Sequence, residues 1–340
     1  MAPSPPRLVC VTGGGGYVAS WLVKLLLSRG YAVHATVRDP RDPKNAHLGR
    51  LDGAAARLRV FEADMLDGDA LAAAVAGCEG VFHVACPVPS GKVAHPESEV
   101  LAPAVNGTLN VLQVCSANNV QKVVVVSSDA AVHFNPNWPQ DKPKDESCWS
   151  DKNLCMKNED WYCAAKTAAE ETALEYAEKN GLNVVTVCPC VVLGPLLQPV
   201  VNTSSEFLVY IIKGGPTEMN NLLWHIVDVR DVADALLLVY EKAESSGRYI
   251  CAPNWISIQN LVNFLKKTHP SYNYVTCATD FKSAVTPLTS EKLRNLGWKP
   301  RAIEETLLDS IEYYEMTGIL KDVEGSPSGL PPLFHWATDK

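Results

Sequence analysis

The chain has 340 residues, a formal net charge of −8, and a composition of 47% hydrophobic and 20% charged residues. This mixture is typical of a globular protein, and the length suits one large domain or two fused lobes. The acidic balance disfavours a nucleic-acid partner, no apolar run reaches the roughly 20 residues of a membrane span, and eleven cysteines in so long a chain do not indicate a secreted disulfide framework. We therefore expect a reduced, cytoplasmic protein.

Short β-branched runs alternate with helix-length segments along the first half of the chain. This alternation predicts βαβ units, and uninterrupted apolar runs such as VVVV predict strands buried on both faces. The expected fold class is α/β, a Rossmann-type doubly wound parallel sheet with a smaller C-terminal lobe. Strands are predicted at Leu8–Thr12, Ala32–Val37, Arg59–Phe61, Gly80–Val84, Lys122–Ser127 and Asn183–Cys188, and helices at Trp21–Ser28, Ala70–Ala76, Val105–Ala117, Trp161–Asn180 and Ile303–Thr317.

The sequence pattern changes after about Phe134. The stretch NPNWPQDKPKDESCWSD predicts a long surface loop, and the βα alternation weakens from Val191 onward. We therefore predict two parts: residues 1–190, which contain most of the sheet, and residues 191–340, which form mainly the smaller lobe and interleave with the sheet. The C-terminal tail VEGSPSGLPPLFHWATDK has no periodicity, so docking alone would order it.

A glycine-rich turn, VTGGGGYVA, joins the first predicted strand to the first helix. Gly13 allows a tight turn, and its glycine neighbours let backbone amides approach a pyrophosphate at the positive end of the helix. In this context the turn favours dinucleotide binding over a purely structural role. The cofactor contacts predicted here are Thr12, Gly13, Gly15, Gly16, Tyr17 and Val18.

The end of the second strand, TVRD, bears on the choice between NAD and NADP. Arg38 can grip the 2′-phosphate of NADP(H) bidentately, and Lys44 can add a point charge, so NADP(H) is favoured. Two alternatives stay open: Arg38 paired with Asp39 or Asp42 at the surface, and Asp39 as an acid of the NAD type. Further cofactor contacts are predicted at Asp64, for which helix capping is a competing role, and at Met65, Ala85 and Pro189.

Tyr162 and Lys166 lie four residues apart in the predicted helix Trp161–Asn180 and therefore share one of its faces. An ammonium group lowers the pKa of a nearby phenol and so assists proton transfer. Ser127 and Ser128 end the VVVV strand, at the edge where ligands bind in such sheets. A serine there can hold a carbonyl oxygen while Tyr162 delivers the proton. Together with the glycine turn, these residues predict a carbonyl reductase.

The chain resembles extended short-chain dehydrogenases/reductases, and specifically plant cinnamoyl-CoA reductases and their dihydroflavonol-reductase relatives. The similarity runs from about Leu8 to about Leu320 and includes TVRDP, DPKNAHL, DESCWSD, DWYCAAK, VVLGPLLQP and VDVRDVADA. The resemblance implies a catalytic triad of Ser128, Tyr162 and Lys166, selects Ser128 over Ser127, and implies 2′-phosphate contacts from Arg38 and Lys44.

In function, the resemblance implies an NADPH-dependent reductase of plant phenylpropanoid and lignin metabolism. The reaction would convert a hydroxycinnamoyl-CoA ester to a cinnamaldehyde, or a cinnamaldehyde to its alcohol. Three alternatives remain: a reductase of dihydroflavonols or other ketones and aldehydes, an epimerase with retained NAD, and a non-catalytic NADP-binding protein. Arg38 argues against the epimerase, and the intact triad argues against the last.

Departures from the family pattern concern the substrate. The family's usual NWYCYGK reads DWYCAAK here, and its SSIGAV-type segment reads SSDAAV. Phe207 and Tyr210 stand where the family carries a His and a Lys that help hold coenzyme A. A free aldehyde or ketone therefore competes with a CoA ester as substrate. The substrate pocket is predicted to involve Val191, Phe207, Tyr210 and His225.

Cys155 and Cys163 match two cysteines of the family pattern and form a candidate redox pair beside Tyr162. Two packed free thiols are the alternative. No metal site is predicted, because no C-x-x-C pair or partnered histidine accompanies them. The expected partner is a small phenylpropanoid-type molecule, and the chain is expected to be a monomer or dimer.

Overall fold

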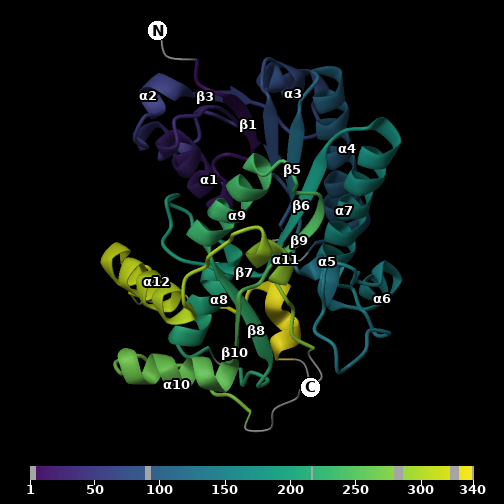
Figure 1. Cartoon of the computed structure of the whole chain (residues 1–340). Helices are drawn as coiled ribbons and strands as arrows, with labels where there is room; N and C mark the ends of the chain where they lie inside the picture. The colour runs from purple at the N-terminus through teal and green to yellow at the C-terminus, as the bar shows by residue number, and fades with distance from the viewer. Residues whose placement is uncertain (1–4, 89–92, 216, 279–285, 322–328, 339–340) are drawn as a thin grey trace.

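The computed structural model describes residues 5–88, 93–215, 217–278, 286–321 and 329–338 (Figure 1). Its centre is a seven-stranded sheet in the order β3-β2-β1-β4-β5-β6-β9, in which every neighbouring pair is parallel. The predicted α/β Rossmann-type sheet is confirmed. The strands are β1 (Leu8–Thr12), β2 (Ala32–Val37), β3 (Leu58–Glu62), β4 (Gly80–His83), β5 (Lys122–Val126), β6 (Val184–Pro189) and β9 (Gly247–Cys251).

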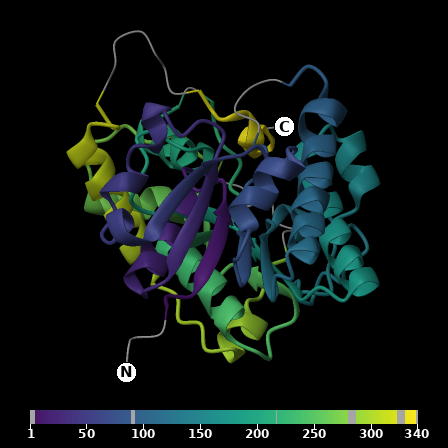
Figure 2. The same ribbon diagram turned by 90° about the horizontal axis from the view of Figure 1, so that it is seen from above.

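Helices cover both faces of this sheet (Figure 2). On one face α1 (Tyr17–Ser28) packs against α9 (Val229–Glu241), and on the other α4 (Ala102–Ala117) packs between α3 (Gly68–Val75) and α7 (Trp161–Asn180). In β1, Val9 and Val11 belong to the apolar cluster of the first face, whereas Cys10 belongs to that of the second. Burial on both sides explains why the strands are almost continuously apolar.

A second, smaller sheet forms the core of the other lobe, in the lower half of Figure 1. Its order is β10-β8-β7, with β8 parallel to β7 and antiparallel to β10. The chain does not divide cleanly at residue 190, because α9 and β9 return to the large sheet after β7 and β8. This lobe contains β7 (Val191–Leu193), β8 (Leu223–Asp228), β10 (Asn254–Ser257), α8 (Thr203–Ile212), α10 (Ile258–Thr268) and α12 (Ile303–Thr317).

Shorter elements complete the described chain. They are η1 (Pro43–Asn45), η2 (Leu48–Arg50), α2 (Ala54–Arg57), η3 (Glu97–Leu101), α5 (Ala130–His133), α6 (Lys152–Lys157), α11 (Glu291–Asn295) and η4 (Pro332–Ala337). Helix α6 was not predicted and directly follows the loop stretch that ends at Asp151; Asp151 caps it by accepting hydrogen bonds from two backbone amides. Helix α1 begins at Tyr17 rather than at Trp21, because the glycine turn leads directly into it.

The described part of the tail is docked, as expected for a segment without its own periodicity. Asn220 N donates to Ala337 O at 2.8 Å, and the ring of Phe334 stacks on Phe207 at 4.3 Å between centroids. Within the described residues, the helix over Glu97–Ala117 is long and apolar enough to cross a membrane by length and composition alone. A core helix passes the same test, and α4 packs against α3 and α7.

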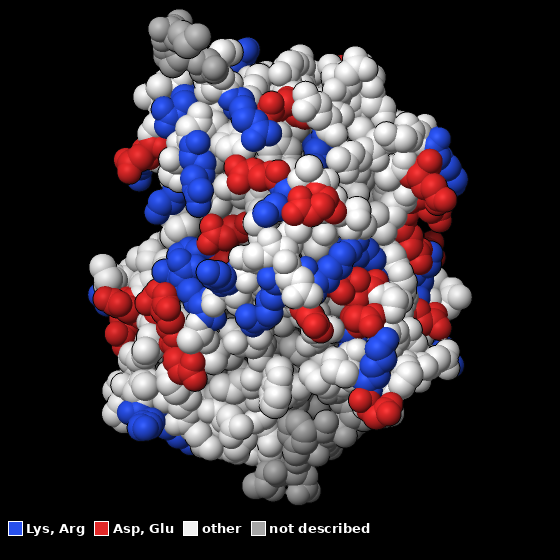
Figure 3. All heavy atoms as spheres, viewed as in Figure 1, with Lys and Arg blue, Asp and Glu red and all other residues white. Residues whose placement is uncertain are grey.

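Basic and acidic side chains are interspersed on the face seen in Figure 3, with no extended area of a single sign. This face shows no basic stripe of the type that follows a nucleic-acid backbone.

Candidate active site

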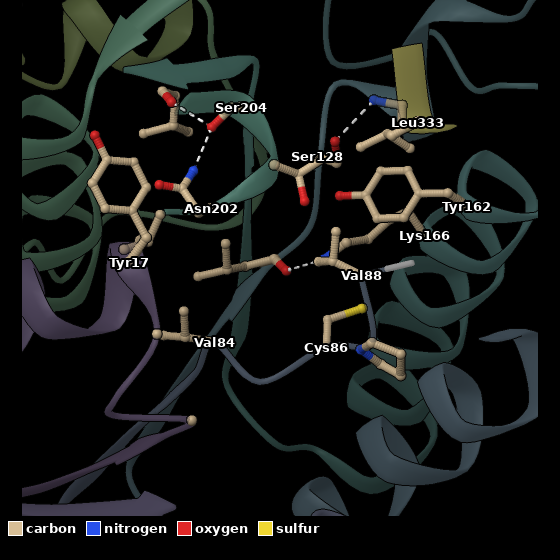
Figure 4. Close-up of a pocket in the computed structure, with 18 of the residues that line it drawn as sticks. Tyr17, Val84, Cys86, Val88, Ser128, Tyr162, Lys166, Asn202, Ser204 and Leu333 are labelled. Carbon is tan, nitrogen blue, oxygen red and sulfur yellow. Dashed lines mark hydrogen bonds between the residues drawn. The ribbon is translucent and has the colours of Figure 1, made fainter. Parts of the chain in front are cut away.

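A cavity of about 1710 Å³ lies between the carboxyl edge of the large sheet and the second lobe. Every residue predicted to contact the cofactor lines it, and so do Ser128, Tyr162 and Lys166 (Figure 4). The turns after β1 and β4 meet here because these strands are neighbours although β2 and β3 separate them in sequence. This is the topological switch point at which such sheets bind ligands.

The glycine turn has a backbone that requires glycine. Gly13 has a φ of 66°, and a Cβ there would come within 3.0 Å of Ala85 Cα, so a side chain would meet both strain and a neighbouring backbone. A Cβ at Gly15 would overlap the side-chain oxygen of Asn45. Thr12 Oγ1 holds the turn against the residues that follow β4, because it accepts hydrogen bonds from Val84 N and Ala85 N, both at 3.1 Å. A backbone held this closely fits a pyrophosphate at the start of α1.

The basic residues Arg38 and Lys44 differ in whether an acidic side chain already pairs with them. Arg38 is exposed at the cavity and, within the described part of the chain, makes no hydrogen bond or ion pair. Lys44 instead pairs with Asp42 at 2.7 Å. The alternative in which Arg38 is paired with Asp39 or Asp42 does not occur, since Asp39 is the partner of Arg41. Arg38 is therefore the cation that is available for a phosphate.

Asp64 has one carboxylate oxygen engaged in a local turn, accepting from Leu66 N at 2.9 Å. It does not cap helix α3, because Asp67 does so by accepting from Asp69 N and Ala70 N. The competing capping role is therefore wrong, and Asp64 faces the cavity together with Met65, Ala85 and Pro189.

The side chains of Ser128 and Tyr162 point toward one another across the cavity floor (Figure 4). Burial raises the pKa of Tyr162 to about 12; the Lys166 ammonium and a hydrogen bond with Ser128 act in the opposite direction but do not outweigh it. The expectation that Lys166 lowers this pKa thus gives the direction of its own effect but not the net result. At neutral pH Tyr162 is a phenol, the state that a proton donor requires.

Lys166 is buried, and its Nζ donates to Val126 O at 3.1 Å and lies 6.0 Å from the centre of the Tyr162 ring. Burial alone would lower the pKa of Lys166, but Cys86 and Tyr162 together raise it above its ordinary value. It therefore remains an ammonium beside the phenol. The contact from Cys86, which lines the cavity, was not predicted from the sequence.

Ser127 has a structural role instead. Its hydroxyl donates to Glu170 Oε2 at 2.8 Å, and Glu170 forms a buried ion pair with Arg248 at 2.8 Å. Arg248 also donates to Cys148 O at 2.7 Å. Because Glu170 follows Lys166 by one turn of α7, this network fixes α7 to β5 and β9. Ser127 and Ser128 both line the cavity, but the Ser127 hydroxyl is committed to Glu170, which agrees with the choice of Ser128 as the catalytic serine.

The residues predicted for the substrate pocket divide into two groups. Val191 and His225 line the cavity, but Phe207 and Tyr210 do not. Both are buried in the core of the second lobe, where Phe207 lies 4.5 Å from Trp224 between ring centres. Phe207 packs against Trp224 of β8 and Phe334 of η4, which both line the cavity, so it supports the wall of the pocket from behind. The Tyr210 hydroxyl instead accepts from Thr217 N at 3.3 Å.

Several cavity residues were missed by the sequence analysis. A signal existed for Asp129, which lies in the altered SSDAAV segment. Leu333 gave no signal, because the tail showed no periodicity. These residues are Cys86, Asp129, His133, Lys144, Asn202, Ser204, Leu333 and Phe334.

Cys155 and Cys163 also line the cavity, and both thiols are free and buried. The hydrogen bond between them lowers the pKa of Cys155 and, together with burial, raises that of Cys163. The two sulfurs are thus in contact without being bonded.

The NAD dependent epimerase/dehydratase family matches residues 9–252. The chain belongs to this family. Its members include relatives in the plant reductase branch: the chain is 43% identical to cinnamoyl-CoA reductase 2 of Medicago truncatula over 317 residues, covering 92% of this chain and 93% of that one. The expected resemblance is confirmed.

Solved structures agree with this family. Vestitone reductase from alfalfa superposes with a TM-score of 0.80 at 34% identity, covering 92% of this chain and 99% of that one. The yeast methylglyoxal/isovaleraldehyde reductase complexed with NADPH gives a TM-score of 0.79 at 26% identity, with 92% and 99% covered. The expectation of an NADP-dependent oxidoreductase is confirmed at the level of the family.

Proposed function

We propose that the chain is an NADPH-dependent reductase of small aromatic carbonyl compounds of the phenylpropanoid type. The supporting observation is that Ser128, Tyr162 and Lys166 share one cavity with the glycine turn and with the unpaired Arg38. In this proposal the amides of the turn hold the pyrophosphate and Arg38 holds the 2′-phosphate. Residues 1–190 supply most of the cofactor site, and residues 191–340 supply most of the substrate wall.

The chain's own residues carry the proton chemistry. Bound NADPH supplies a hydride to the carbonyl carbon. Ser128 and Tyr162 hydrogen-bond the carbonyl oxygen and polarise it, and the Tyr162 hydroxyl donates its proton to that oxygen as negative charge develops. The Lys166 ammonium stabilises the phenolate that remains and lies where it can also contact the cofactor ribose.

Free aldehydes and ketones are the preferred substrate class in this proposal. The wall next to β8 is backed by the apolar side chain of Phe207, and the η4 segment with Leu333 and Phe334 lies on the cavity. None of these three side chains offers a charge to a CoA phosphate. Vestitone and methylglyoxal, which the two structural neighbours reduce according to their names, are likewise free carbonyl compounds.

A hydroxycinnamoyl-CoA ester is the second candidate, supported by the 43% identity to a cinnamoyl-CoA reductase. Hydride addition would then give a tetrahedral adduct that expels the thiol and yields an aldehyde. The same groups would act on the oxygen in both cases, so only the leaving group separates the two reactions.

The test measures NADPH oxidation with a panel of cinnamaldehydes, dihydroflavonols and hydroxycinnamoyl-CoA esters, with product identification. We expect alcohols from free carbonyl compounds at a kcat/KM above that for any CoA ester. Aldehyde from CoA esters as the main product would favour the second candidate. No oxidation with any compound, in protein that still binds NADPH, would contradict the proposed function.

Two further proposals concern the surroundings of the reaction. The cysteines are free thiols throughout the described residues, which supports a reducing compartment such as the cytoplasm.

Cys155 and Cys163 are close enough to interact, and we propose that oxidation would join them beside Tyr162. Mass spectrometry of the oxidised protein after alkylation of free thiols tests this: linked Cys155 and Cys163 peptides are expected, and their absence would contradict it.

A further inference from the structure

A carboxylate and an imidazole stand beside the catalytic serine in this chain. Asp129 follows Ser128 directly, and His133 lies one helical turn later in α5. Both side chains line the same cavity as Ser128 and Tyr162. They belong to the SSDAAVH segment, which departs from the family pattern, and the reaction described above gives them no role.

The carboxylate of Asp129 contacts both Ser128 and His133, one with each of its oxygens. Ser128 Oγ donates to Asp129 Oδ1 at 3.1 Å, and His133 Nε2 lies 2.9 Å from Asp129 Oδ2. The side chains of Asp129 and His133 are 16% and 23% exposed, so the pair is largely shielded but open to the cavity. The proton that Ser128 would offer to a carbonyl oxygen is therefore directed to a carboxylate.

This arrangement has an electrostatic consequence for the reaction. Reduction places negative charge on the carbonyl oxygen, and a carboxylate held next to Ser128 opposes that charge. The negative charge of Asp129 contributes to the raised pKa of Tyr162 on α7 and to that of Cys190 after β6. A protonated His133 would compensate for the charge, whereas a neutral His133 would leave it in place.

Other groups around the pair do not substitute for His133. Lys144 Nζ donates to the backbone oxygen of His133 at 2.5 Å, and the His225 ring on β8 lies 5.7 Å from the His133 ring. Burial lowers the pKa of His225 to about 3, so it carries no charge at neutral pH. Lys166 donates to Val126 O on the far side of Ser128.

We propose that His133 is a positioning residue that neutralises Asp129 and so frees the Ser128 hydroxyl to hydrogen-bond the substrate's carbonyl oxygen. This inference rests on the proposed reductase function. Its consequence is that replacing His133 slows carbonyl reduction only while Asp129 keeps its negative charge.

The test compares kcat for carbonyl reduction from pH 5.5 to 8.5 in the full-length wild type, Asp129→Asn, His133→Gln and the double variant. We expect His133→Gln to lose about tenfold in kcat at pH 6, since one uncompensated charge corresponds to roughly one pKa unit of interaction. Asp129→Asn should not depend on His133, so the double variant should recover to the level of Asp129→Asn. His269→Gln, at a half-buried position on the second lobe, is the matched control.

Two results would overturn the proposal: a His133→Gln variant as active as the wild type with an unchanged pH profile, or a double variant no better than His133→Gln. The second result would mean that His133 acts only through packing. NMR spectra of the imidazoles need no substrate, and Asp129→Asn should change the chemical shifts of the His133 ring; unchanged shifts would also overturn the pairing. A wild type that reduces no carbonyl compound would instead contradict the proposed function.

Discussion

The two sides of the cavity are built in different ways. The cofactor side consists of turns that directly follow β1, β2, β3 and β4, so its residues come from short segments at one sheet edge. The substrate side combines the end of β5, the loop before α6, β7, β8 and the C-terminal η4 segment (Figure 1). The first side depends on local backbone geometry, and the second depends on which distant segments happen to pack together.

This difference explains what could be predicted from the sequence. Gly13 and Gly16 flank a turn whose strand and helix context is local, and every residue predicted from that context lines the cavity. Phe207 and Tyr210 were predicted by position in a motif, but Phe334 docks on Phe207 and stands between it and the cavity, while only the first turn of α8 lines the pocket. The tail has no pattern that reveals such a docking site.

The catalytic residues could be predicted from the sequence only in part. Tyr162 and Lys166 share a helix face and could be predicted from their spacing. Their environment could not, because the net pKa of Tyr162 depends on burial by segments far away in sequence. The position of Glu170 beneath Ser127 likewise depends on Arg248, which lies in β9.

The largest expected effect is that of Tyr162→Phe, which removes the proton donor common to both sides of the cavity. We expect kcat for carbonyl reduction to fall by about 10²–10⁴-fold, the usual contribution of general acid catalysis. NADPH affinity, measured by fluorescence titration, should change little because the glycine turn and Arg38 are intact. A variant with the wild-type kcat would remove Tyr162 from the mechanism.

The next largest effect is expected on stability, from Glu170→Gln. This change leaves the buried guanidinium of Arg248 without its carboxylate, which typically costs about 3–5 kcal/mol of unfolding free energy. Denaturant unfolding measures it. The matched control is Glu175→Gln on the same helix, whose carboxylate pairs with Lys179 at the exposed surface and should contribute no more than about 0.5 kcal/mol. Equal effects from the two variants would contradict the role of the network.

Arg38→Ala tests the cofactor side alone. Loss of a charge-assisted, bidentate phosphate contact corresponds to about 1.5–3 kcal/mol, so NADPH should bind roughly ten- to a hundredfold more weakly while NADH binding is unchanged. Lys44→Ala is the comparison, and a smaller loss is expected because Lys44 is already paired with Asp42. An equal loss for both cofactors would show that Arg38 does not contact the 2′-phosphate.

The smallest effect is expected from Phe334→Leu on the substrate side. The ring loses its stacking on Phe207, which corresponds to about 0.5–1.5 kcal/mol of unfolding free energy. The KM for the carbonyl substrate should rise a few-fold while NADPH affinity stays constant. Met316→Leu, at a position that is 79% exposed, is the control. A change in NADPH affinity but not in KM would contradict the division between the two sides.

The most direct test of the central claim follows the transferred hydrogen. NADPH that carries deuterium at the reactive C4 position is incubated with a free aromatic aldehyde or ketone and either the wild type or Tyr162→Phe. For the wild type we predict one deuterium on the former carbonyl carbon of the alcohol and NADP⁺ as the other product, with little or no product from the variant. Conversion of a substrate with the label still on the cofactor would contradict the account, because it would indicate chemistry with a retained nucleotide rather than net reduction.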